Sequence, residues 1–241
     1  MLNPVPNELI TLQGEVRQAF GWSLDADDSS AMEMEKCFSE PHPFGQEAWS
    51  IESRKSALVS LKQSICSAER LVIIGAGSES IQTHQYPGAK FVAADGAVGA
   101  LDDLSRVLCV VSDGDGAEHL ERAARHGIHI VLHAHGDNAD IWKHLASKWA
   151  NFDSPPPLTL TYQSMKQYDG MYNPGGFTDG DRALCLIRAL GRSLDAVECI
   201  GFRTDYVGPW SGTTDLLRKK QKLRWMEESM RRLGVEHHLI N

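Results

Sequence analysis

From residue 70 onward, short apolar runs alternate with stretches of helical pattern, and this alternation constrains the fold more than any other feature. Six runs have the length and apolar content of buried strands: RLVIIG, KFVAAD, VLCVVSD, IHIVLH, LTLTYQ and VECIGF. Amphipathic segments such as AEHLERAARHG and NADIWKHLASKWA lie between them. Continuously apolar strands that alternate with helices are typical of a parallel sheet. The sequence therefore predicts an α/β fold, with a mostly parallel, Rossmann-like sheet and helices on both faces.

The residues before this series carry helical patterns and no strand-like run. ELITLQGEVRQAFGWSL and SIESRKSALVSLKQSI repeat apolar residues at helical spacing, and the prolines of EPHPFG separate them. We expect a small helical N-terminal region over residues 1–68 and an α/β domain over residues 69–241. A last helix over TTDLLRKKQKLRWMEESMRRLG should end at Gly234, and the terminal VEHHLI is a candidate edge strand.

Charge and composition exclude several classes of partner. The formal net charge of −8 argues against a nucleic-acid partner, which would require a basic face. No apolar stretch approaches the roughly 20 residues that cross a bilayer, so we expect no membrane partner. The five cysteines form no C-x-x-C pair and the chain shows no secretory signal, which favours a cytoplasmic location. The oligomeric state stays open, with a homo-oligomer as one option.

Aspartates gather where the predicted strands end. In open parallel sheets the ligand site lies beyond the carboxyl ends of the strands. The segments AADGA, VVSDGDG, LHAHGDN and GGFTDGDRAL each follow a strand. Together they contain Asp95, Asp113, Asp115, Asp137, Asp179 and Asp181.

A single aspartate is commonly a turn residue or a helix cap, and Thr178 or Asp179 alone would cap the helix of DRALCLIRALG. The two D-x-D pairs contain more aspartates than helix capping requires. Carboxylates crowded into one crevice repel each other unless a cation lies among them. Mg²⁺ prefers such oxygen ligands and joins them to substrate phosphates, so the pattern favours phosphoryl or nucleotidyl chemistry.

The stretch LHAHGDNAD raises the alternative of zinc. His133 and His135 would face the same side of a strand, and Asp137 is available as the third ligand that a catalytic zinc site normally has. The intervening glycine and the many carboxylates elsewhere on the rim count against zinc. Hydrogen bonding of the histidines to substrate or to carboxylates is the favoured interpretation, and a purely structural turn is the other alternative.

Two further segments suit phosphate binding. VIIGAGSES places Gly75, Gly77 and Ser78 ahead of a possible helix, where backbone N–H groups can approach a phosphate, although a lone G-x-G is more often a tight turn. LLRKKQKLRW is the only dense positive segment. Lys219 and Lys222 share one face of its helix, where they would grip a polyphosphate or simply face solvent. Tyr206 and Trp210 are candidates to stack on a planar ring.

GAGSES, AADGA, VVSDGDG, HAHGDN and GGFTDGDRAL, in this order and at these separations, resemble the archaeal 6-hydroxymethyl-7,8-dihydropterin pyrophosphokinase family. The chain is more distantly similar to thiamine pyrophosphokinases. FGWSLDADDSSAMEMEKCF and LRKKQKL extend the resemblance over nearly the whole chain. The chain departs from the family in GAGSES, where a proline more usually follows the second glycine, and at Gly114, where a bulkier apolar residue is usual. Neither departure removes a ligand-type side chain.

The resemblance implies a diphosphokinase with its catalytic domain over residues 69–241. Such an enzyme transfers diphosphate from ATP to the hydroxymethyl group of a reduced pterin and releases AMP, with Mg²⁺ as cofactor. The step serves the synthesis of tetrahydromethanopterin or folate-type cofactors. ATP and the reduced pterin are the implied partners.

The resemblance also implies roles for individual residues. The expected catalytic residues are Asp95, Asp113, Asp115, His135, Asp137 and Asp181. The expected Mg²⁺ ligands among them are Asp113, Asp115 and Asp137. The expected substrate- and nucleotide-binding residues are Gly75, Gly77, Ser78, His133, Asn138, Thr178, Asp179, Arg182, Lys219 and Lys222.

Other functions stay open at this point. The same diphosphate transfer with another acceptor, such as thiamine, is the main rival, and a transferase that holds a sugar nucleotide with its D-x-D pair is a more distant one. A zinc amidohydrolase would need more metal ligands at downstream strand ends. A non-catalytic nucleotide-binding module would need the glycine turn but not six aspartates.

Overall fold

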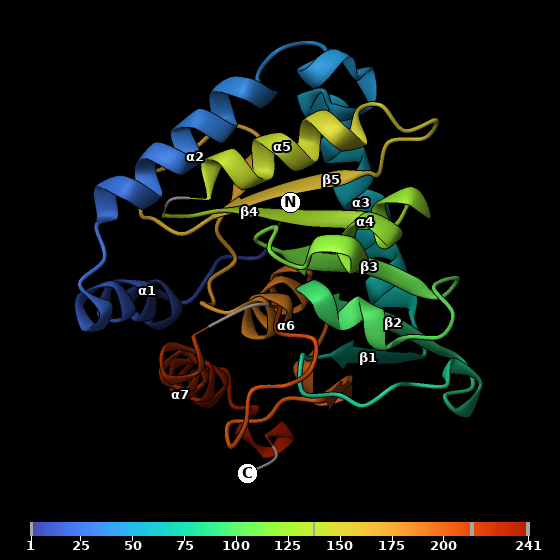
Figure 1. Cartoon of the computed structure of the whole chain (residues 1–241), viewed down its shortest axis with the longest axis vertical. Coiled ribbons are helices and arrows are strands. Elements are labelled where there is room, and N and C mark those ends of the chain that lie inside the picture. The colour runs from blue at the N-terminus through green and yellow to red at the C-terminus, as the bar shows by residue number, and fades with distance from the viewer. Residues whose placement is uncertain (1, 137, 213–214, 240–241) are drawn as a thin grey trace.

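The computed structural model describes residues 2–136, 138–212 and 215–239, and its strands form one all-parallel sheet in the order β6-β5-β4-β3-β2-β1-β7 (Figure 1). The strands are β1 (Arg70–Ile74), β2 (Ala89–Ala94), β3 (Val107–Ser112), β4 (His129–Ala134), β5 (Leu158–Tyr162), β6 (Met171–Tyr172) and β7 (Val197–Ile200). Six of the seven coincide with the apolar runs of the sequence. The predicted α/β fold with a parallel sheet is confirmed.

The order of the strands follows the order of the chain until β6. The chain then returns through helix α6 (Asp179–Leu190) to place β7 beside β1, where Leu71 is paired with Val197. Crossovers between parallel strands are right-handed, so reversing the direction of travel along the sheet moves the connecting helix to the opposite face. Helices α4 (Ala117–Arg125) and α5 (Ala139–Trp149) accordingly cover one face, and α6 covers the other.

Successive side chains along each strand point to opposite faces of the sheet and pack into two separate hydrophobic cores. Val72 and Ile74 pack with α4, α5 and the buried rings of Trp142 and Trp149. Leu71 and Ile73 point the other way and pack with α6. The strands are apolar at nearly every position because both faces of the sheet are covered.

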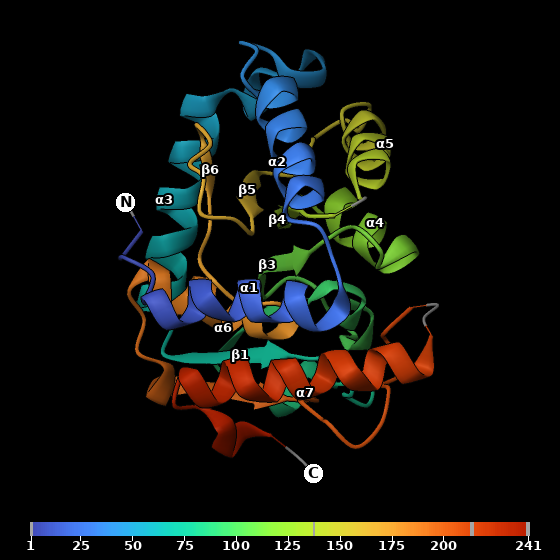
Figure 2. The same cartoon turned by 90° about the vertical axis from the view of Figure 1, so that its left-hand side faces the viewer.

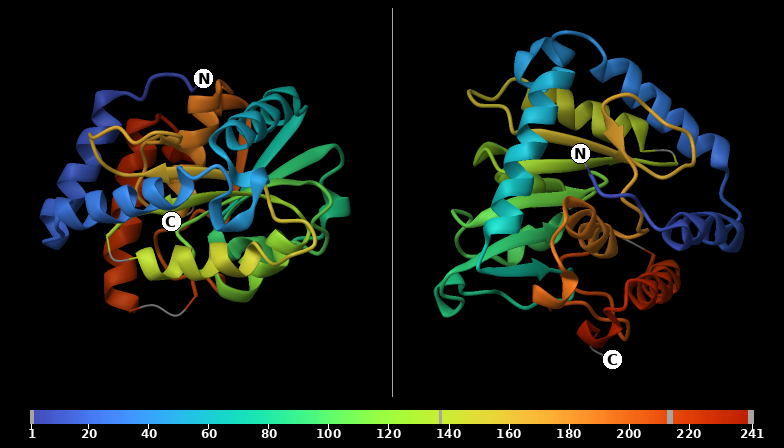
Figure 3. Two further views of the ribbon diagram at one scale, coloured as in Figure 1. Left: turned by 90° about the horizontal axis from the view of Figure 1, so that it is seen from above. Right: turned by 180° about the vertical axis from the view of Figure 1, so that it is seen from behind.

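Two of the three helices that precede the sheet pack into the same two cores, and the first packs in a smaller, separate cluster. The three helices are α1 (Asn7–Phe20), α2 (Leu24–Phe38) and α3 (Ile51–Ser67). Met34 and Phe38 of α2 join the α5 side. Helix α3 lies across the other face of the sheet, which Figure 3 shows in the view from behind. These N-terminal helices confirm the helical region that was expected ahead of the sheet.

Helix α1 lies alongside α7 (Leu216–Arg232) at one edge of the molecule (Figure 2). Leu12 and Val16 of α1 pack on Phe177, two residues before the start of α6. Ser23 caps α2 by accepting a hydrogen bond from the backbone N–H of Asp25 at 3.1 Å. The Gly136 N–H, which follows β4, donates to Asp27 Oδ1 at 2.7 Å and holds the start of α2 near the carboxyl end of that strand.

Short 3-10 turns complete the described structure. They span Pro43–Gly45, Glu47–Trp49, Thr83–Gln85, Asp95–Ala100, Leu194–Ala196 and Glu236–His238. Among the described residues, no helix is long and apolar enough to cross a membrane.

Two sequence expectations are wrong. The segment VEHHLI is not an edge strand over its described residues, because Glu236–His238 form a 3-10 turn. The possible helix after Gly77 does not form either. The chain instead makes a turn against the loop that follows β7, where a Cβ on Gly75 or Gly77 would lie 2.8 Å from the carbonyl oxygen of Gly201.

Candidate active site

Three carboxylates from neighbouring strand ends form a compact acidic cluster. Asp95 follows β2, and Asp113 and Asp115 follow β3. One oxygen from each lies within 4.8 Å of the others. Among the residues that the structure describes, no other group of three His, Cys, Asp or Glu side chains brings its possible ligand atoms this close together. The parallel sheet brings these side chains together because all its strands end at the same edge.

Asp95 reaches the cluster through an unusual backbone conformation. Its φ of 48° lies in the left-handed region, which few residues other than glycine adopt. Its Oδ1 accepts hydrogen bonds from the Ser112 hydroxyl at 2.5 Å and from the Gly116 N–H at 3.1 Å. A Cβ on Gly116 would lie 2.6 Å from that oxygen, so the close approach requires glycine.

The cluster contains more negative charge than the protein itself neutralises. Burial, followed by the charges of Asp179, Asp115 and Asp113, raises the pKa of Asp95 well above its usual value. Burial and the charge of Asp113 also raise the pKa of Asp115. Burial alone would raise the pKa of Asp113 too, but the hydrogen bond and charge of His135 and the charge of Arg182 hold it below its usual range. Asp113 is therefore held in its ionised form.

The residues of the cluster fit a divalent cation. Asp113 Oδ1 is buried and has no hydrogen-bond partner among the described residues, whereas buried carboxylate oxygens are normally paired. Oxygen ligands from one or two carboxylates are what Mg²⁺ takes from a protein. Asp137, the third expected metal ligand, lies outside the described residues.

Asp113 is oriented by residues that follow β4. The Nε2 of His135 lies 3.0 Å from Asp113 Oδ2. The amide of Asn138 donates to the carbonyl oxygens of Asp113 and His133, and its Oδ1 accepts from the His135 N–H and from the Ser30 hydroxyl. The Asn138 side chain thus links the ends of β3 and β4. Its oxygen accepts two hydrogen bonds and its nitrogen donates two, all within the protein.

His133 lies apart from the acidic cluster. It is 1% exposed, and its Nδ1 lies 2.9 Å from the Thr161 hydroxyl on β5. Burial lowers its pKa well below the usual value, so its imidazole is neutral. The candidate ligand group among the described residues contains neither His133 nor His135.

At the start of α6, Asp179 and Asp181 form a D-x-D pair in the sequence but have different surroundings in the structure. Asp181 is fully buried and accepts hydrogen bonds from the Phe177 N–H, the Thr178 N–H and the Thr178 hydroxyl, at 2.5 to 2.7 Å. The bond from the Thr178 N–H is one half of the capping box of α6; in the other half the Thr178 side chain accepts from the Asp181 N–H. Asp179 instead lines a cavity beside the acidic cluster, and burial together with the charge of Asp113 raises its pKa to about 7.

Arg182 lies between Asp179 and Asp113. Its Nη1 is 3.1 Å from Asp179 Oδ1 and 3.9 Å from Asp113 Oδ2. Its Nη2 donates to Gln163 at 3.0 Å, and the Gln163 amide donates in turn to Asp27 of α2 at 3.1 Å. Asp27 also accepts from Arg17 of α1 at 2.9 Å. This buried chain of hydrogen bonds ties the N-terminal helices to the site, and sequence reasoning missed Arg17, Asp27 and Gln163.

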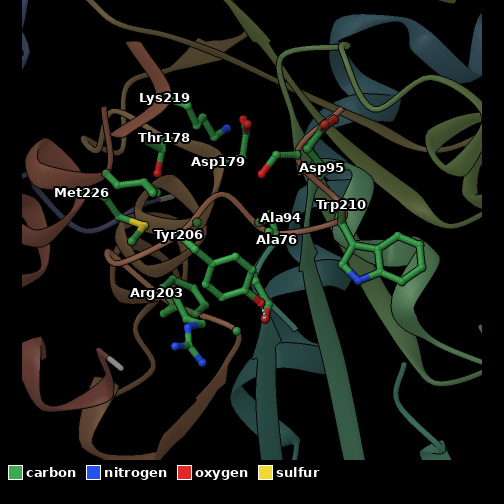
Figure 4. Close-up of a pocket in the computed structure, with 18 of the residues that line it drawn as sticks. Ala76, Ala94, Asp95, Thr178, Asp179, Arg203, Tyr206, Trp210, Lys219 and Met226 are labelled. Atoms are coloured by element: carbon green, nitrogen blue, oxygen red, sulfur yellow. Dashed lines mark hydrogen bonds between the residues drawn. The ribbon is translucent and has the colours of Figure 1, made fainter. Parts of the chain in front are cut away.

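One cavity, which we call the glycine-turn cavity, opens beside Asp95, Asp115 and Asp179 (Figure 4). Lys219 of α7 lines it, and Figure 4 shows the Lys219, Asp179 and Asp95 side chains directed into the same space. Ala76 and Tyr206 lie on its other side, with the Tyr206 hydroxyl donating to the Gly77 carbonyl oxygen at 2.9 Å.

Gly75, Gly77 and Ser78 bound or adjoin this cavity, but their N–H groups are already used. The Gly75 N–H donates to the Ile200 carbonyl, the Gly77 N–H to the Gly201 carbonyl, and the Ser78 N–H to the Gly75 carbonyl. The turn therefore joins the ends of β1 and β7. Trp210 is held nearby by a 2.9 Å bond from its Nε1 to the Ser78 carbonyl oxygen.

A second cavity of about 580 Å³, which we call the Trp22 cavity, lies beside His135. Trp22, Arg218 and Lys222 line it together with Asp27. Lys219 and Lys222 share a face of α7 as expected, but each lines a different cavity. Sequence reasoning missed Trp22 and Arg218 as site residues. The signal available was the motif FGWSLDADD, which contributed to the family resemblance.

The fold and the site together define an α/β protein with an acidic, cation-compatible site at the carboxyl edge of a parallel sheet. No family model matches the chain. It is 34% identical over 149 residues to the 6-hydroxymethyl-7,8-dihydropterin pyrophosphokinase of Pyrococcus furiosus, a match that covers 59% of this chain and 60% of the relative. Proteins of the same name from Methanothermobacter thermautotrophicus and Methanocaldococcus jannaschii are 38% and 29% identical.

The last two matches cover 42% and 71% of this chain and 41% and 69% of the relatives. The chain thus spans about 60% of the length of the Pyrococcus relative. The resemblance expected from the motifs is confirmed: the chain is a homologue of the archaeal 6-hydroxymethyl-7,8-dihydropterin pyrophosphokinases.

Proposed function

We propose that this chain is an enzyme that transfers diphosphate from ATP to 6-hydroxymethyl-7,8-dihydropterin in the presence of Mg²⁺, giving AMP and the pterin diphosphate. The observation that carries the proposal is the acidic cluster, in which a buried Asp113 oxygen has no partner among the described residues. The names of the three homologues supply the substrate and the reaction class. In cells the product would feed the synthesis of tetrahydromethanopterin or a folate-type cofactor.

Asp113 and Asp115 are the proposed ligands of Mg²⁺, with Asp95 beside them. When bound, the cation supplies a positive charge that neutralises the phosphate oxygens of the reacting centre. The charge distribution of the cluster supports this assignment, because three crowded carboxylates are stabilised when a cation lies among them.

The chain's own contribution is to bind and align the two substrates. Lys219 and Lys222 extend from one face of α7 toward the acidic cluster, where their ammonium groups would bind the oxygens of the transferred diphosphate. Arg182 is held rigidly by Asp179 and Gln163, so its guanidinium is fixed beside Asp113. Fixed cations near the transferred group stabilise the developing charge without reorganisation.

Asp179 is the proposed partner of the pterin hydroxyl. It lines the glycine-turn cavity beside the acidic cluster, and its pKa of about 7 lets it accept a hydrogen bond or share a proton near neutrality. A stronger base is unnecessary, because phosphoryl transfer through a loose transition state depends mainly on alignment and charge stabilisation.

The test is a reaction of the purified protein with ATP, MgCl₂ and 6-hydroxymethyl-7,8-dihydropterin, followed by chromatographic separation of the products. AMP and a diphosphorylated pterin in equal amounts are expected. Parallel reactions contain thiamine in place of the pterin, or EDTA in place of MgCl₂. Release of ADP, or turnover with thiamine and none with the pterin, would contradict the proposal.

A further inference from the structure

Two cavities adjoin the acidic cluster, one directly and the other through His135. Asp95 and Asp115 line the glycine-turn cavity, whereas Asp113 is hydrogen-bonded to His135, which lines the Trp22 cavity. In phosphoryl transfer the attacking oxygen and the leaving oxygen lie on opposite sides of the phosphorus. The two substrates of such a reaction therefore approach from opposite sides, and the two cavities provide separate places for them.

The two cavities differ in charge. Arg218, Lys222 and His135 line the Trp22 cavity. Its two carboxylates are already occupied: Asp27 accepts hydrogen bonds from Arg17, Gln163 and the Gly136 N–H, and Asp215 caps α7 by accepting from the Arg218 N–H at 2.7 Å.

The glycine-turn cavity has the opposite character. Three carboxylates, those of Asp95, Asp115 and Asp179, face the single ammonium of Lys219, and the Arg203 guanidinium is paired with Asp205 at 2.5 Å. A polyanionic substrate is favoured in the first cavity. A neutral ring rich in N–H donors is favoured in the second, because carboxylates accept hydrogen bonds from such groups.

The Trp22 cavity also offers an aromatic platform. The ring of Phe20 stacks on Trp22 with centroids 4.5 Å apart and planes inclined by 16°, which fixes the orientation of the indole. The guanidinium carbon of Arg218 lies 5.2 Å from the Trp22 ring centroid, and the Lys222 ammonium lies 5.6 Å from it. The volume of about 580 Å³ is within the range of small-molecule sites.

We propose that the Trp22 cavity binds the purine nucleotide donor, with the base stacked on Trp22 and with Arg218 and Lys222 on its phosphates. The acceptor then approaches from the glycine-turn cavity, with its hydroxyl beside Asp179. That cavity has a volume of about 60 Å³, so it admits only the reacting part of the acceptor. The assignment rests on the proposed function for the identity of the two substrates. Arg218 is exposed, so its side chain is free to leave the indole when a base arrives and to contact the phosphates instead.

The experiment measures nucleotide binding without turnover. The probe is α,β-methylene-ATP, in which a methylene group replaces the oxygen that bridges the α and β phosphorus atoms, so that the transfer cannot release AMP. It is titrated calorimetrically into the full chain with MgCl₂. Trp22→Leu should weaken its binding about tenfold, which is typical of a lost base–aromatic stack. Arg218→Gln, an exposed change with little bearing on folding, should weaken binding several-fold.

Trp225→Leu is the matched control. Trp225 belongs to the same small cluster as Phe20 and Trp22 but lines a different groove, between α1 and α7. It should change the affinity for the analogue less than twofold. Equal losses in Trp22→Leu and Trp225→Leu would show that Trp22 acts only through packing, and would overturn the proposal. Trp22→Phe keeps a ring and should retain most of the affinity.

Steady-state kinetics of Arg218→Gln separate the two substrates. The KM for ATP should rise several-fold while the KM for the pterin stays within twofold of the unsubstituted value. A raised KM for the pterin with unchanged analogue binding would place the acceptor in the Trp22 cavity and overturn the assignment. If the analogue binds through Trp22 but the pterin is not converted, the proposed function fails and the nucleotide site stands.

Discussion

At the scale of single residues, the two oxygens of Asp113 have different surroundings. Oδ2 is hydrogen-bonded to His135 at 3.0 Å, while Oδ1 is buried without a partner among the described residues. The first contact keeps the carboxylate ionised and oriented. Oδ1 is left without a hydrogen bond among the described residues, so it is available as a metal ligand.

Replacing this carboxylate tests its role directly. Asp113→Asn keeps the shape but removes the charge, so turnover should fall by at least about 100-fold, since even the residues that orient metal ligands are worth 10- to 100-fold. The variant should also lose the rise in melting temperature that MgCl₂ produces by binding the folded state. Thermal melts with and without MgCl₂ and the pterin assay measure both effects.

Asp153→Asn is the control for this change, because Asp153 is exposed and lies in the loop between α5 and β5. It should keep both the turnover and the response to MgCl₂. Retained turnover in Asp113→Asn would remove Asp113 from the metal site.

At the scale of secondary-structure elements, the start of α6 shows how one helix combines stability and site formation. Its first turn contains Asp179, which lines the glycine-turn cavity, and Asp181, which closes the capping box with Thr178. Arg182 follows directly and reaches Asp113. Holding the first turn of α6 in place therefore holds the groups that face the acidic cluster.

The capping box predicts a variant whose defect is mainly in stability. Asp181→Ala leaves the buried N–H groups of Phe177 and Thr178 without their acceptor, and the free energy of unfolding should fall by about 3 kcal/mol. Urea denaturation measures this change. Asp215→Ala, which removes a single exposed cap bond from α7, should cost about 1 kcal/mol. A fully stable Asp181→Ala variant without turnover would instead support the catalytic role that the sequence predicts.

Most elements of the fold could be predicted because their patterns are local. Continuous apolar runs mark β1 to β5 since both faces of those strands are buried. The edge strand β7 also follows an apolar run, although it is only partly buried. The two-residue strand β6 is too short to carry a pattern, and Val235 is buried outside any strand, so an apolar residue in VEHHLI was no evidence of an edge strand. Strand-end aspartates could be expected to converge for the same topological reason.

The remaining site residues depend on tertiary packing. Trp22 reaches the site because α1 and α2 dock on the sheet, and Gln163 because its amide bridges Arg182 and Asp27. Sequence spacing offered Thr178 or Asp179 as the cap of α6 and Asp181 as a catalytic residue, because spacing alone cannot tell whether a side chain turns back on its own helix. The structure of the glycine turn could not be predicted either. Its Gly75 and Gly77 N–H groups donate to carbonyl oxygens at the end of β7, which is distant in the sequence.

At the scale of the whole molecule, β4 lies within the sheet, between β3 and β5, and carries two buried histidines. His129 is 7% exposed, and its ring Nε2 lies 2.8 Å from the Thr159 hydroxyl. Burial lowers the pKa of His129 to about 4. In the unfolded chain the same group has a pKa of about 6.5, so between these values the unfolded state binds the proton and the folded state does not.

The fold should therefore lose stability as the pH falls from about 6.5 to 4. His129 alone accounts for a decrease on the order of 3 kcal/mol in the free energy of unfolding across that window. Urea denaturation at pH 7 and at pH 4.5 should show a smaller difference for His129→Gln than for the unsubstituted protein. Identical differences in the two proteins would exclude His129 as a source of acid sensitivity.

The pairing of β1 with both β2 and β7 has a consequence for biosynthesis. Strand β1 ends at Ile74, but the partner for its second edge begins only at Val197. At roughly 5–20 residues per second, the ribosome takes on the order of ten seconds to add the intervening chain. Throughout that interval the nascent protein presents an open β1 edge on which another chain can pair. The glycine turn and α7 can complete the two cavities only after that edge has closed.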